Sequence, residues 1–273
     1  MGFLEFKDKQ YDGPYEVSEI EIHNEGQIFK GILYFPRDDF KKPYPLIIYF
    51  HDFPQLFTLK EIVRNYQYLL ESGFAFLVFN FRGYRSSEGI ISIESQVSDS
   101  FKVIEFIQIM SGNGIFSIQN INILTHGFGS YIALILCSQI NIINKLLLLC
   151  PILDLQRHVY NENFPKSLYY INRFLPGNIR GIDDIDKFIK KTKIELKRKE
   201  YQIKAFIKEI EYNEMKLIIG ELDKITPIHE LNQIIPKDLK NFDIVVISGM
   251  DHDCIEDNHL EKIKNEISSF FIK

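Results

Sequence analysis

The sequence is poor in cysteine, with only Cys137, Cys150 and Cys254 among its 273 residues. These residues lie far apart, and two of them fall inside apolar runs. We therefore expect buried free thiols and no disulfide framework. Disulfides are rare in reducing compartments, so this usage favours an intracellular, cytoplasmic location.

Long hydrophobic runs are also missing. No apolar stretch approaches the roughly 18 residues that a membrane-spanning helix needs. Residues 1–9 carry charges where a signal peptide has its apolar core. Phe6 stands at the position where a myristoylation motif has Ser or Thr. The sequence therefore predicts no membrane partner.

An excess of positive charge is absent as well. The chain has 32 basic and 37 acidic residues and a formal net charge of -5. It thus lacks the basic face that nucleic-acid-binding proteins usually show. The histidines show no metal-ligand spacing, so we expect neither a metal nor a cofactor. Hydrophobic residues at 45% and charged residues at 25% are ordinary for a folded domain with a sizeable core.

Apolar runs alternate with helical periodicity from residue 46 onward. Before them, residues 17–23 and 27–35 alternate apolar and polar, which predicts an antiparallel hairpin at a sheet edge. Continuous apolar runs predict buried strands and 3.6-residue spacing predicts helices: strands at 46–50, 74–79, 121–124, 145–150, 215–219 and 242–247, and helices at 58–71, 95–110, 131–136, 227–235 and 258–271. This order predicts an α/β fold with a mostly parallel central sheet and helices on both faces.

One segment interrupts the alternation. Residues 155–212 have no strand pattern; their first part is aromatic and loop-like, and their second part is rich in lysine with a broken apolar stripe. We interpret the lysines as a solvated helix face. The sequence therefore predicts a core of residues 1–154 and 213–273, with residues 155–212 as a helical cap over the carboxyl edge of the sheet.

The stretch Thr125-His126-Gly127-Phe128-Gly129 joins a predicted strand directly to a predicted helix. Strand, sharp turn and helix are the setting of the nucleophile elbow, which usually reads Gly-x-Ser-x-Gly. His126 and Gly129 fit the common Gly-His-Ser-x-Gly form, but Gly127 stands at the serine position. Glycine adopts the positive φ of this turn freely, yet it lacks the Oγ that would form an acyl-enzyme.

Further motifs follow in an order that resembles the α/β-hydrolase superfamily over nearly the whole chain. They are a His-Gly-x-like turn at 51–53, a relative of Asp-x-Arg-Gly-x-Gly-x-Ser-x-Gly at 80–89, the elbow at 125–130, an acid loop of the form Gly-x-x-Asp-x-x-x-Pro at 219–227 and a histidine loop at 248–252. The sequence is most similar to feruloyl and cinnamoyl esterases and to acyl-peptidase-like and dienelactone-hydrolase-like serine hydrolases. The resemblance implies a small acyl or aromatic ester or amide as ligand and no cofactor.

The resemblance implies a catalytic acid and a base. Asp223 would be the acid that orients the histidine, and His252 would be the general base. Asp154, just after a predicted strand, is the alternative acid. The backbone N–H groups of Phe53 and Phe128 would form the oxyanion hole.

The resemblance also places His51, Asp52 and His126 at the substrate. Asp52 departs from the family pattern, which has glycine after the histidine. A carboxylate there would oppose a developing oxyanion unless its side chain points away. Together with Gly127, this departure predicts a weakly active or inactive esterase-like protein that keeps a small-ligand pocket.

An active ester or amide hydrolase is the alternative. It would use a displaced nucleophile, Ser130 or Cys254, or a water activated by His252. Ser130 has the position of a helix-start residue, whereas Thr125 is expected nearer the pocket edge. An ordinary esterase in which serine has been exchanged for glycine would give the same sequence.

Overall fold

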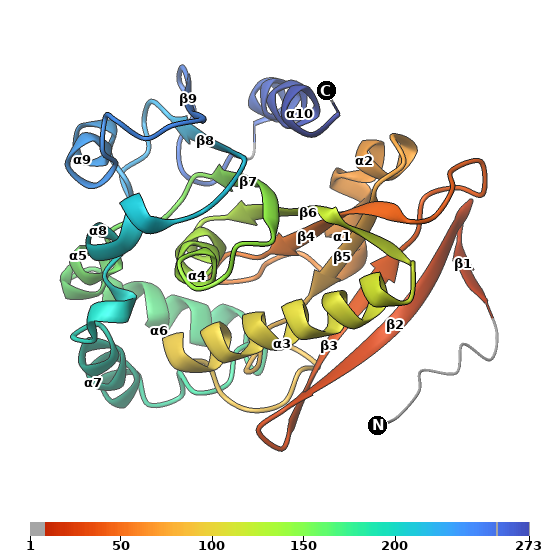
Figure 1. The fold of residues 1–273 in the computed structure, drawn as a ribbon. Helices are drawn as coiled ribbons and strands as arrows, with labels where there is room; N and C mark the ends of the chain where they lie inside the picture. The colour runs from red at the N-terminus through yellow and green to blue at the C-terminus, as the bar shows by residue number, and fades with distance from the viewer. Residues whose placement is uncertain (1–8, 255, 273) are drawn as a thin grey trace.

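The computed structural model describes residues 9–254 and 256–272. The expectations about residues 1–8 fall outside this range. In the described part, one nine-stranded sheet has the order β1-β2-β3-β5-β4-β6-β7-β8-β9 (Figure 1). The strands are β1 Gln10–Asp12, β2 Tyr15–Asn24, β3 Gln27–Tyr34, β4 Tyr44–Phe50, β5 Ala75–Phe79, β6 Phe116–His126, β7 Ile143–Leu149, β8 Glu214–Gly220 and β9 Phe242–Ile247.

The first three strands form the antiparallel edge of the sheet. β2 and β3 pair from Val17 opposite Tyr34 to Asn24 opposite Gln27, which is the hairpin that the alternating pattern predicts. β3 joins β5 antiparallel, and every pairing from β5 to β9 is parallel. The carboxyl ends of these six strands therefore meet at one edge of the sheet.

Helices cover both faces of the sheet. α3 (Ile93–Gly112) and α4 (Phe128–Cys137) pack against one face, with one apolar cluster beneath them. α1 (Leu59–Asn65), α2 (Gln67–Glu71) and α10 (Asp257–Phe271) cover the other face over a second cluster (Figure 1). The mostly parallel sheet with helices on both sides confirms the predicted fold class.

The helix expected at 58–71 is in fact two helices. Thr58 and Glu61 form the predicted capping box at the start of α1. At Tyr66 the backbone leaves the helical region, with φ -113° and ψ 16°, and α2 begins at the next residue. At this break the Tyr66 ring packs on Tyr49 of β4, with centroids 5.5 Å apart.

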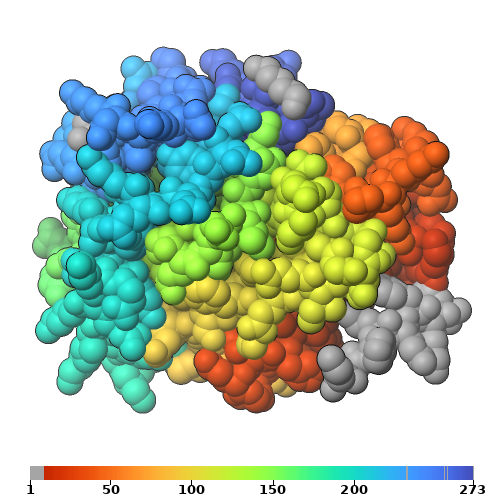
Figure 2. Space-filling model, in the orientation of Figure 1, coloured from red at the N-terminus to blue at the C-terminus, as the bar shows by residue number. Residues whose placement is uncertain are grey.

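A helical segment lies between β7 and β8. It contains α5 (Leu155–Tyr160), α6 (Phe164–Phe174), α7 (Ile185–Glu195) and α8 (Ile203–Phe206), with short 3₁₀ turns on either side of α8 at Lys199–Tyr201 and Ile207–Glu209. Residues 155–212, all of which the structure describes, contain no strand. In the space-filling view the segment forms a continuous surface with α3 (Figure 2). Its boundaries as a separate cap remain a prediction.

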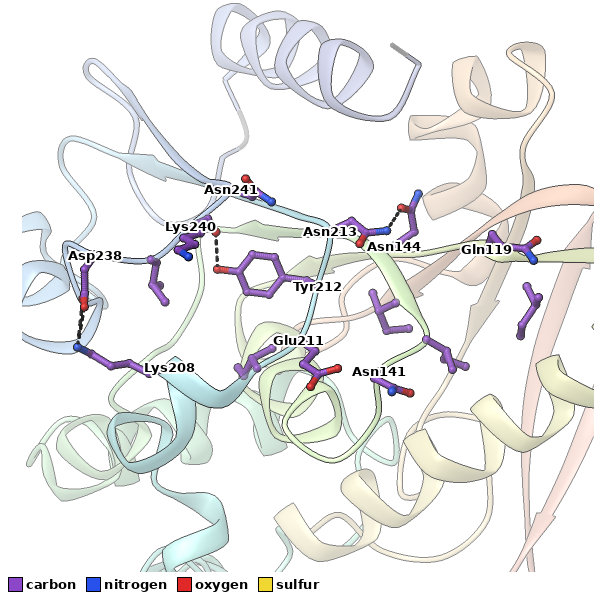
Figure 3. Close-up of a pocket in the computed structure, with 15 residues that line it drawn as sticks. Gln119, Asn141, Asn144, Lys208, Glu211, Tyr212, Asn213, Asp238, Lys240 and Asn241 are labelled. Carbon is purple, nitrogen blue, oxygen red and sulfur yellow. Dashed lines mark hydrogen bonds and ion pairs between the residues drawn. The ribbon is translucent and has the colours of Figure 1, made fainter.

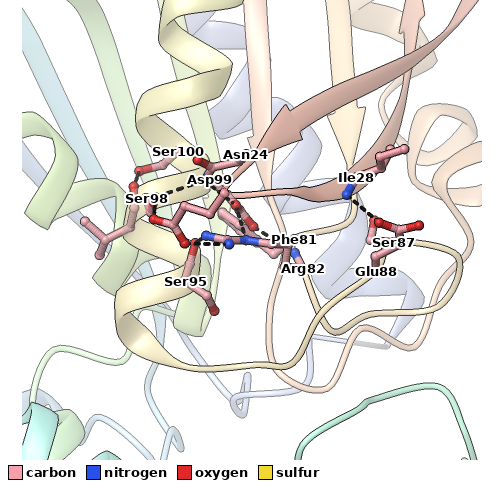
Figure 4. Close-up of polar contacts among 12 residues, drawn as sticks. Asn24, Ile28, Phe81, Arg82, Ser87, Glu88, Ser95, Ser98, Asp99 and Ser100 are labelled. Atoms are coloured by element: carbon pink, nitrogen blue, oxygen red, sulfur yellow. Dashed lines mark hydrogen bonds and ion pairs between the residues drawn. The ribbon is translucent and has the colours of Figure 1, made fainter.

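A buried ion pair fastens the loop after β5 to the neighbouring elements (Figure 4). Arg82 Nε lies 2.6 Å from Asp99 Oδ1, and their side chains are 5% and 0% exposed. The Arg82 N–H and Asn24 Nδ2 also donate to the Asp99 carboxylate. Burial raises the pKa of Asp99, against the hydrogen bonds from Arg82 and Asn24. The motif at 80–89 therefore joins the β2–β3 hairpin to α3.

Candidate active site

The candidate site lies at the carboxyl edge of the sheet, at the point where the order of the strands reverses. β4 is flanked by β5 on one side and by β6 on the other. Open parallel sheets bind ligands at such a switch point, outside the carboxyl ends of the strands. The loops after β4, β6, β8 and β9 carry Asp52, Gly127, Asp223 and His252 to this edge.

The turn between β6 and α4 has the form of a nucleophile elbow. Gly127 alone separates the strand from the helix, with φ 49° and ψ -115°. A side chain at Gly129 would place its Cβ 2.2 Å from the Phe50 carbonyl oxygen, so glycine is needed for the helix to approach β4. Gly127 N–H donates to Leu149 O at 3.0 Å, which ties the elbow to β7.

The Asp52 carboxylate lies directly over Gly127. A Cβ built at position 127 would be 2.0 Å from Asp52 Oδ1. The same oxygen accepts a hydrogen bond of 2.6 Å from the Phe128 N–H. This N–H begins α4, where the helix dipole favours a negative charge. The carboxylate therefore fills the space that a side chain at position 127 would occupy, and it binds the N–H that the sequence predicts as an oxyanion-hole donor.

Asp223 and His252 form an acid–imidazole pair. His252 Nδ1 lies 2.9 Å from Asp223 Oδ2. Asp223 is buried, and its Oδ1 accepts from the N–H groups of Ile225 and Thr226 at 2.8 and 2.9 Å. Asp154, the alternative acid, instead caps α5 by accepting from the Arg157 N–H. The structure thus brings Asp223, and not Asp154, to the histidine.

His252 carries a positive charge at neutral pH. Burial disfavours the charged ring, but the hydrogen bond to Asp223 and the charges of Asp52 and Asp223 outweigh it and raise the pKa of His252 to about 9. A protonated imidazole has no lone pair with which to accept a proton. In this arrangement His252 is the ion-pair partner of Asp223, and the nearby charge of Asp52 adds to the preference for the protonated ring.

The raised pKa of His252 predicts how stability depends on pH. The folded state holds the proton more tightly than the unfolded chain, so the stabilisation is complete below about pH 6.5 and disappears as pH rises through about 9. The shift corresponds to about 3 kcal/mol. Denaturant unfolding at a series of pH values should show this loss, and His252→Gln should flatten the profile over the same range. An unchanged slope in the variant would contradict the assignment.

His51 lies inside the protein, and its expected contact with a substrate remains a prediction. Its ring is buried, and burial lowers the pKa of His51 to about 4, so the ring is neutral. Nδ1–H donates to the carbonyl of Asp52 at 2.8 Å, and Nε2 accepts from the Phe81 N–H at 3.2 Å. The ring packs edge-on against Tyr84. His51 therefore holds the loop that carries Asp52.

The hydroxyl groups next to the elbow have structural roles. Thr125 Oγ1 and Ser130 Oγ lie 2.6 Å apart, and Thr125 also donates to Leu147 O. Both side chains are 0% exposed, so Thr125 does not face the pocket edge as expected. Cys254 is 5% exposed, and its Sγ lies 2.8 Å from Cys150 Sγ. Neither candidate displaced nucleophile presents a free side chain to the pocket.

His126 and Phe53 border the site. The His126 ring stacks on His252 with centroids 6.4 Å apart. The Phe53 ring stacks on Phe188 of α7 at 6.4 Å and contacts Phe128 edge-on. Phe53 thereby links the loop after β4 to the helical segment, while the role of its N–H in an oxyanion hole remains a prediction.

A small cavity lies beside the rings of Phe53 and Phe128. Its volume is about 40 Å³, and its walls are mostly apolar. Gln96 of α3 and His158 of α5 also line it. Sequence reasoning missed both residues, because they come from distant helices and belong to no motif.

A wider groove of about 840 Å³ lies at the opposite edge, where β7, β8 and β9 begin (Figure 3). Several polar groups that line the groove form hydrogen bonds with one another. Asn213 donates to Asn144, Tyr212 donates to the carbonyl of Lys240, and Lys208 pairs with a neighbouring carboxylate. The groove contains no serine, cysteine or histidine among its lining residues, so it offers no nucleophile with an adjacent base.

Within residues 9–254 and 256–272, no cluster of three or more His, Cys, Asp or Glu residues has the arrangement of a metal site. Within the same ranges, no helix combines the length and the apolar character needed to cross a bilayer.

Comparison with known proteins identifies the fold. No family model and no curated protein match the sequence. Solved structures do match, among them ferulic-acid-bound Est1E from Butyrivibrio proteoclasticus, with a TM-score of 0.68, 19% identity and coverage of 93% of this chain and 98% of that chain. Together with the sheet order, these matches show that the chain has the α/β-hydrolase fold.

Two further solved structures are similar over 93% of this chain. The α/β hydrolase GrgF from Penicillium sp. sh18 has a TM-score of 0.65 and 18% identity, and 97% of it is covered. The 2,6-dihydroxy-pseudo-oxynicotine hydrolase has a TM-score of 0.67 and 14% identity, and 68% of it is covered. At these identities the likeness concerns the fold.

Proposed function

We propose that this protein is an esterase-like member of the α/β-hydrolase fold that does not carry out serine-type hydrolysis and retains a pocket for a small acyl or aromatic ligand. The proposal rests on the position of the Asp52 carboxylate. This group lies directly above Gly127 and accepts a hydrogen bond from the Phe128 N–H. A substrate carbonyl would find its expected donor occupied and a negative charge in its place. It would also find no Oγ to attack it.

The charge of His252 supports the same conclusion. A water-activating mechanism needs a neutral imidazole, whereas the pKa of about 9 leaves His252 protonated at neutral pH. Ser130 and Cys254 are buried and already bonded, which disfavours a displaced nucleophile. Some catalysis over water, roughly 10³–10⁴-fold, can persist in a triad enzyme without its nucleophile, but this depends on a free oxyanion hole.

The proposed class of ligand is inferred from the residues that line the cavity between the elbow and the helical segment. Its walls are apolar and include the rings of Phe53, Phe128 and Phe188, with His158 beside them. Such walls suit an aromatic or short acyl group, and one of the similar structures holds ferulic acid. Residues of the segment at 155–212 form part of the cavity wall, so the position of this segment determines how large a ligand the cavity admits.

The proposal is tested by probe labelling and ester turnover in one preparation. We expect no labelling by a fluorophosphonate and no hydrolysis of p-nitrophenyl acetate above that of His252→Ala at neutral pH. Ferulate should raise the melting temperature of the wild type, and cyclohexanecarboxylate serves as the non-aromatic control. Labelling at Ser130 or Cys254 would instead show a displaced nucleophile. Turnover that His252→Ala abolishes, without labelling, would show a histidine-activated water.

A further inference from the structure

Two cysteines from distant parts of the chain meet beside the candidate site. Cys150 follows β7 directly, and Cys254 lies two residues after His252. Their sulfurs are 2.8 Å apart although 104 residues separate them in sequence. Both residues have positive φ values, 42° and 56°, which are uncommon for residues with a side chain. The two turns therefore direct the thiols toward one another.

The pKa values of the two thiols are shifted in opposite directions. A hydrogen bond from Cys150 lowers the pKa of Cys254 against the effect of burial, and a hydrogen bond from His126 and the charges of His126 and His252 add to the lowering. The same thiol–thiolate bond, with burial, raises the pKa of Cys150. Of the two sulfurs, Cys254 is therefore the one whose ionised form is favoured. The Cys254 Sγ also lies 3.3 Å from the carbonyl oxygen of His252.

Cys137 provides an internal comparison. It is buried in α4, and burial alone raises its pKa to about 12. A thiol in that state is a poor nucleophile, because the thiolate is the reactive form. Cys137 and Cys254 therefore share near-complete burial and differ in ionisation and in the presence of a second sulfur.

We propose that Cys150 and Cys254 are a reversible dithiol–disulfide pair that hydrogen peroxide oxidises. The Cys254 thiolate attacks one peroxide oxygen, the O–O bond breaks, and the departing hydroxide takes up a proton and leaves as water. The Cys150 sulfur, after losing its proton, then attacks the sulfenic acid of Cys254. The S–S bond forms as the S–O bond breaks, and a second water leaves. The sulfurs lose two electrons in all, and the peroxide gains them.

The geometry requires only a small movement for this step. A disulfide bond is about 2.05 Å long, so the sulfurs must approach by about 0.7 Å. Cys254 is 5% exposed whereas Cys150 is fully buried, so Cys254 is the first of the two that peroxide can meet. The bond would join the loop that carries His252 to the residues that lead into α5. It would also remove the thiolate charge that helps to raise the pKa values of His126 and His252. This inference does not depend on the proposed function.

The test uses the reduced full-length protein with a short exposure to equimolar hydrogen peroxide. Remaining thiols are alkylated under denaturing conditions, and peptides are mapped by mass spectrometry without reductant. We expect a single intramolecular Cys150–Cys254 link that dithiothreitol reverses, formed at least about tenfold faster than any oxidation of Cys137. Cys137→Ser should behave as the wild type. Cys150→Ser should leave a Cys254 sulfenic acid that dimedone traps.

Several results would overturn the proposal. These are oxidation of Cys137 at the rate of the other two cysteines, a link between two chains in place of an internal one, or conversion of Cys254 to sulfinic acid without any link. Because the wild-type map contains its own control in Cys137, the test stands even if a cysteine variant fails to fold.

Discussion

Asp52→Gly combined with Gly127→Ser is expected to give a protein that a fluorophosphonate probe labels, whereas Gly127→Ser alone is not labelled. In the single variant the new side chain meets the Asp52 carboxylate, which lies 2.0 Å from the position of its Cβ. Removing Asp52 vacates that space and frees the Phe128 N–H for an oxyanion. It also removes one of the charges that keep His252 protonated.

The size of the effect should be large. Removing one oxyanion-hole donor from an enzyme typically costs about 10²–10³-fold, so restoring both the donor and the nucleophile should raise the labelling rate by at least about 10²-fold. Asp52→Asn with Gly127→Ser is the matched control, since asparagine keeps the bulk and removes the charge. Labelling of this control equal to that of the glycine double variant would show that charge, and not space, is decisive.

Unfolding measurements on the same variants check the steric argument. Gly127→Ser should lose stability by about 1–3 kcal/mol from its positive φ, in addition to the contact with Asp52. Asp52→Gly should recover part of this loss in the double variant, which gives a favourable coupling in a double-mutant cycle. Strict additivity of the two changes would contradict the contact between positions 52 and 127.

Asp99→Ala is expected to lower the free energy of unfolding by about 3–5 kcal/mol. The substitution leaves the Arg82 guanidinium, whose side chain is 5% exposed, without its buried partner. It also removes the acceptor for the Arg82 N–H and for Asn24. Denaturant unfolding monitored by circular dichroism measures the change.

Glu105→Ala on the same helix is the control for that experiment. Glu105 pairs with Lys102 at the surface, and both side chains are exposed. Exposed pairs contribute about 0–1 kcal/mol, so this variant should remain close to the wild type. A loss for Asp99→Ala no greater than that for Glu105→Ala would show that the buried pair does not hold the hairpin to α3.

The order of strands and helices could be predicted because the signals are local. Apolar runs locate β4 to β9, and the small-residue turn at Gly127 places the elbow between β6 and α4. The break at Tyr66 could not be predicted, since it accompanies packing on Tyr49, a residue of a distant strand. Periodicity alone predicts which face of a helix is apolar. It does not predict which residues pack against that face.

The site could be predicted in part. The loop order indicates Asp223 and His252, which the structure brings within 2.9 Å. The direction of the Asp52 side chain depends on the space over Gly127 and on the N–H of Phe128, which become adjacent only in the folded chain. The same holds for His51, since its neutral, buried state follows from its contacts with Phe81 and Tyr84.

The contact between Asp52 and Gly127 has a consequence for the order in which substitutions can accumulate. With aspartate in its present place, a serine side chain at position 127 would meet the carboxylate, so we expect that substitution alone to lower stability and to bring no activity. With position 52 changed first, the same serine has room. We therefore expect that position 52 must change before a serine can be accommodated at position 127.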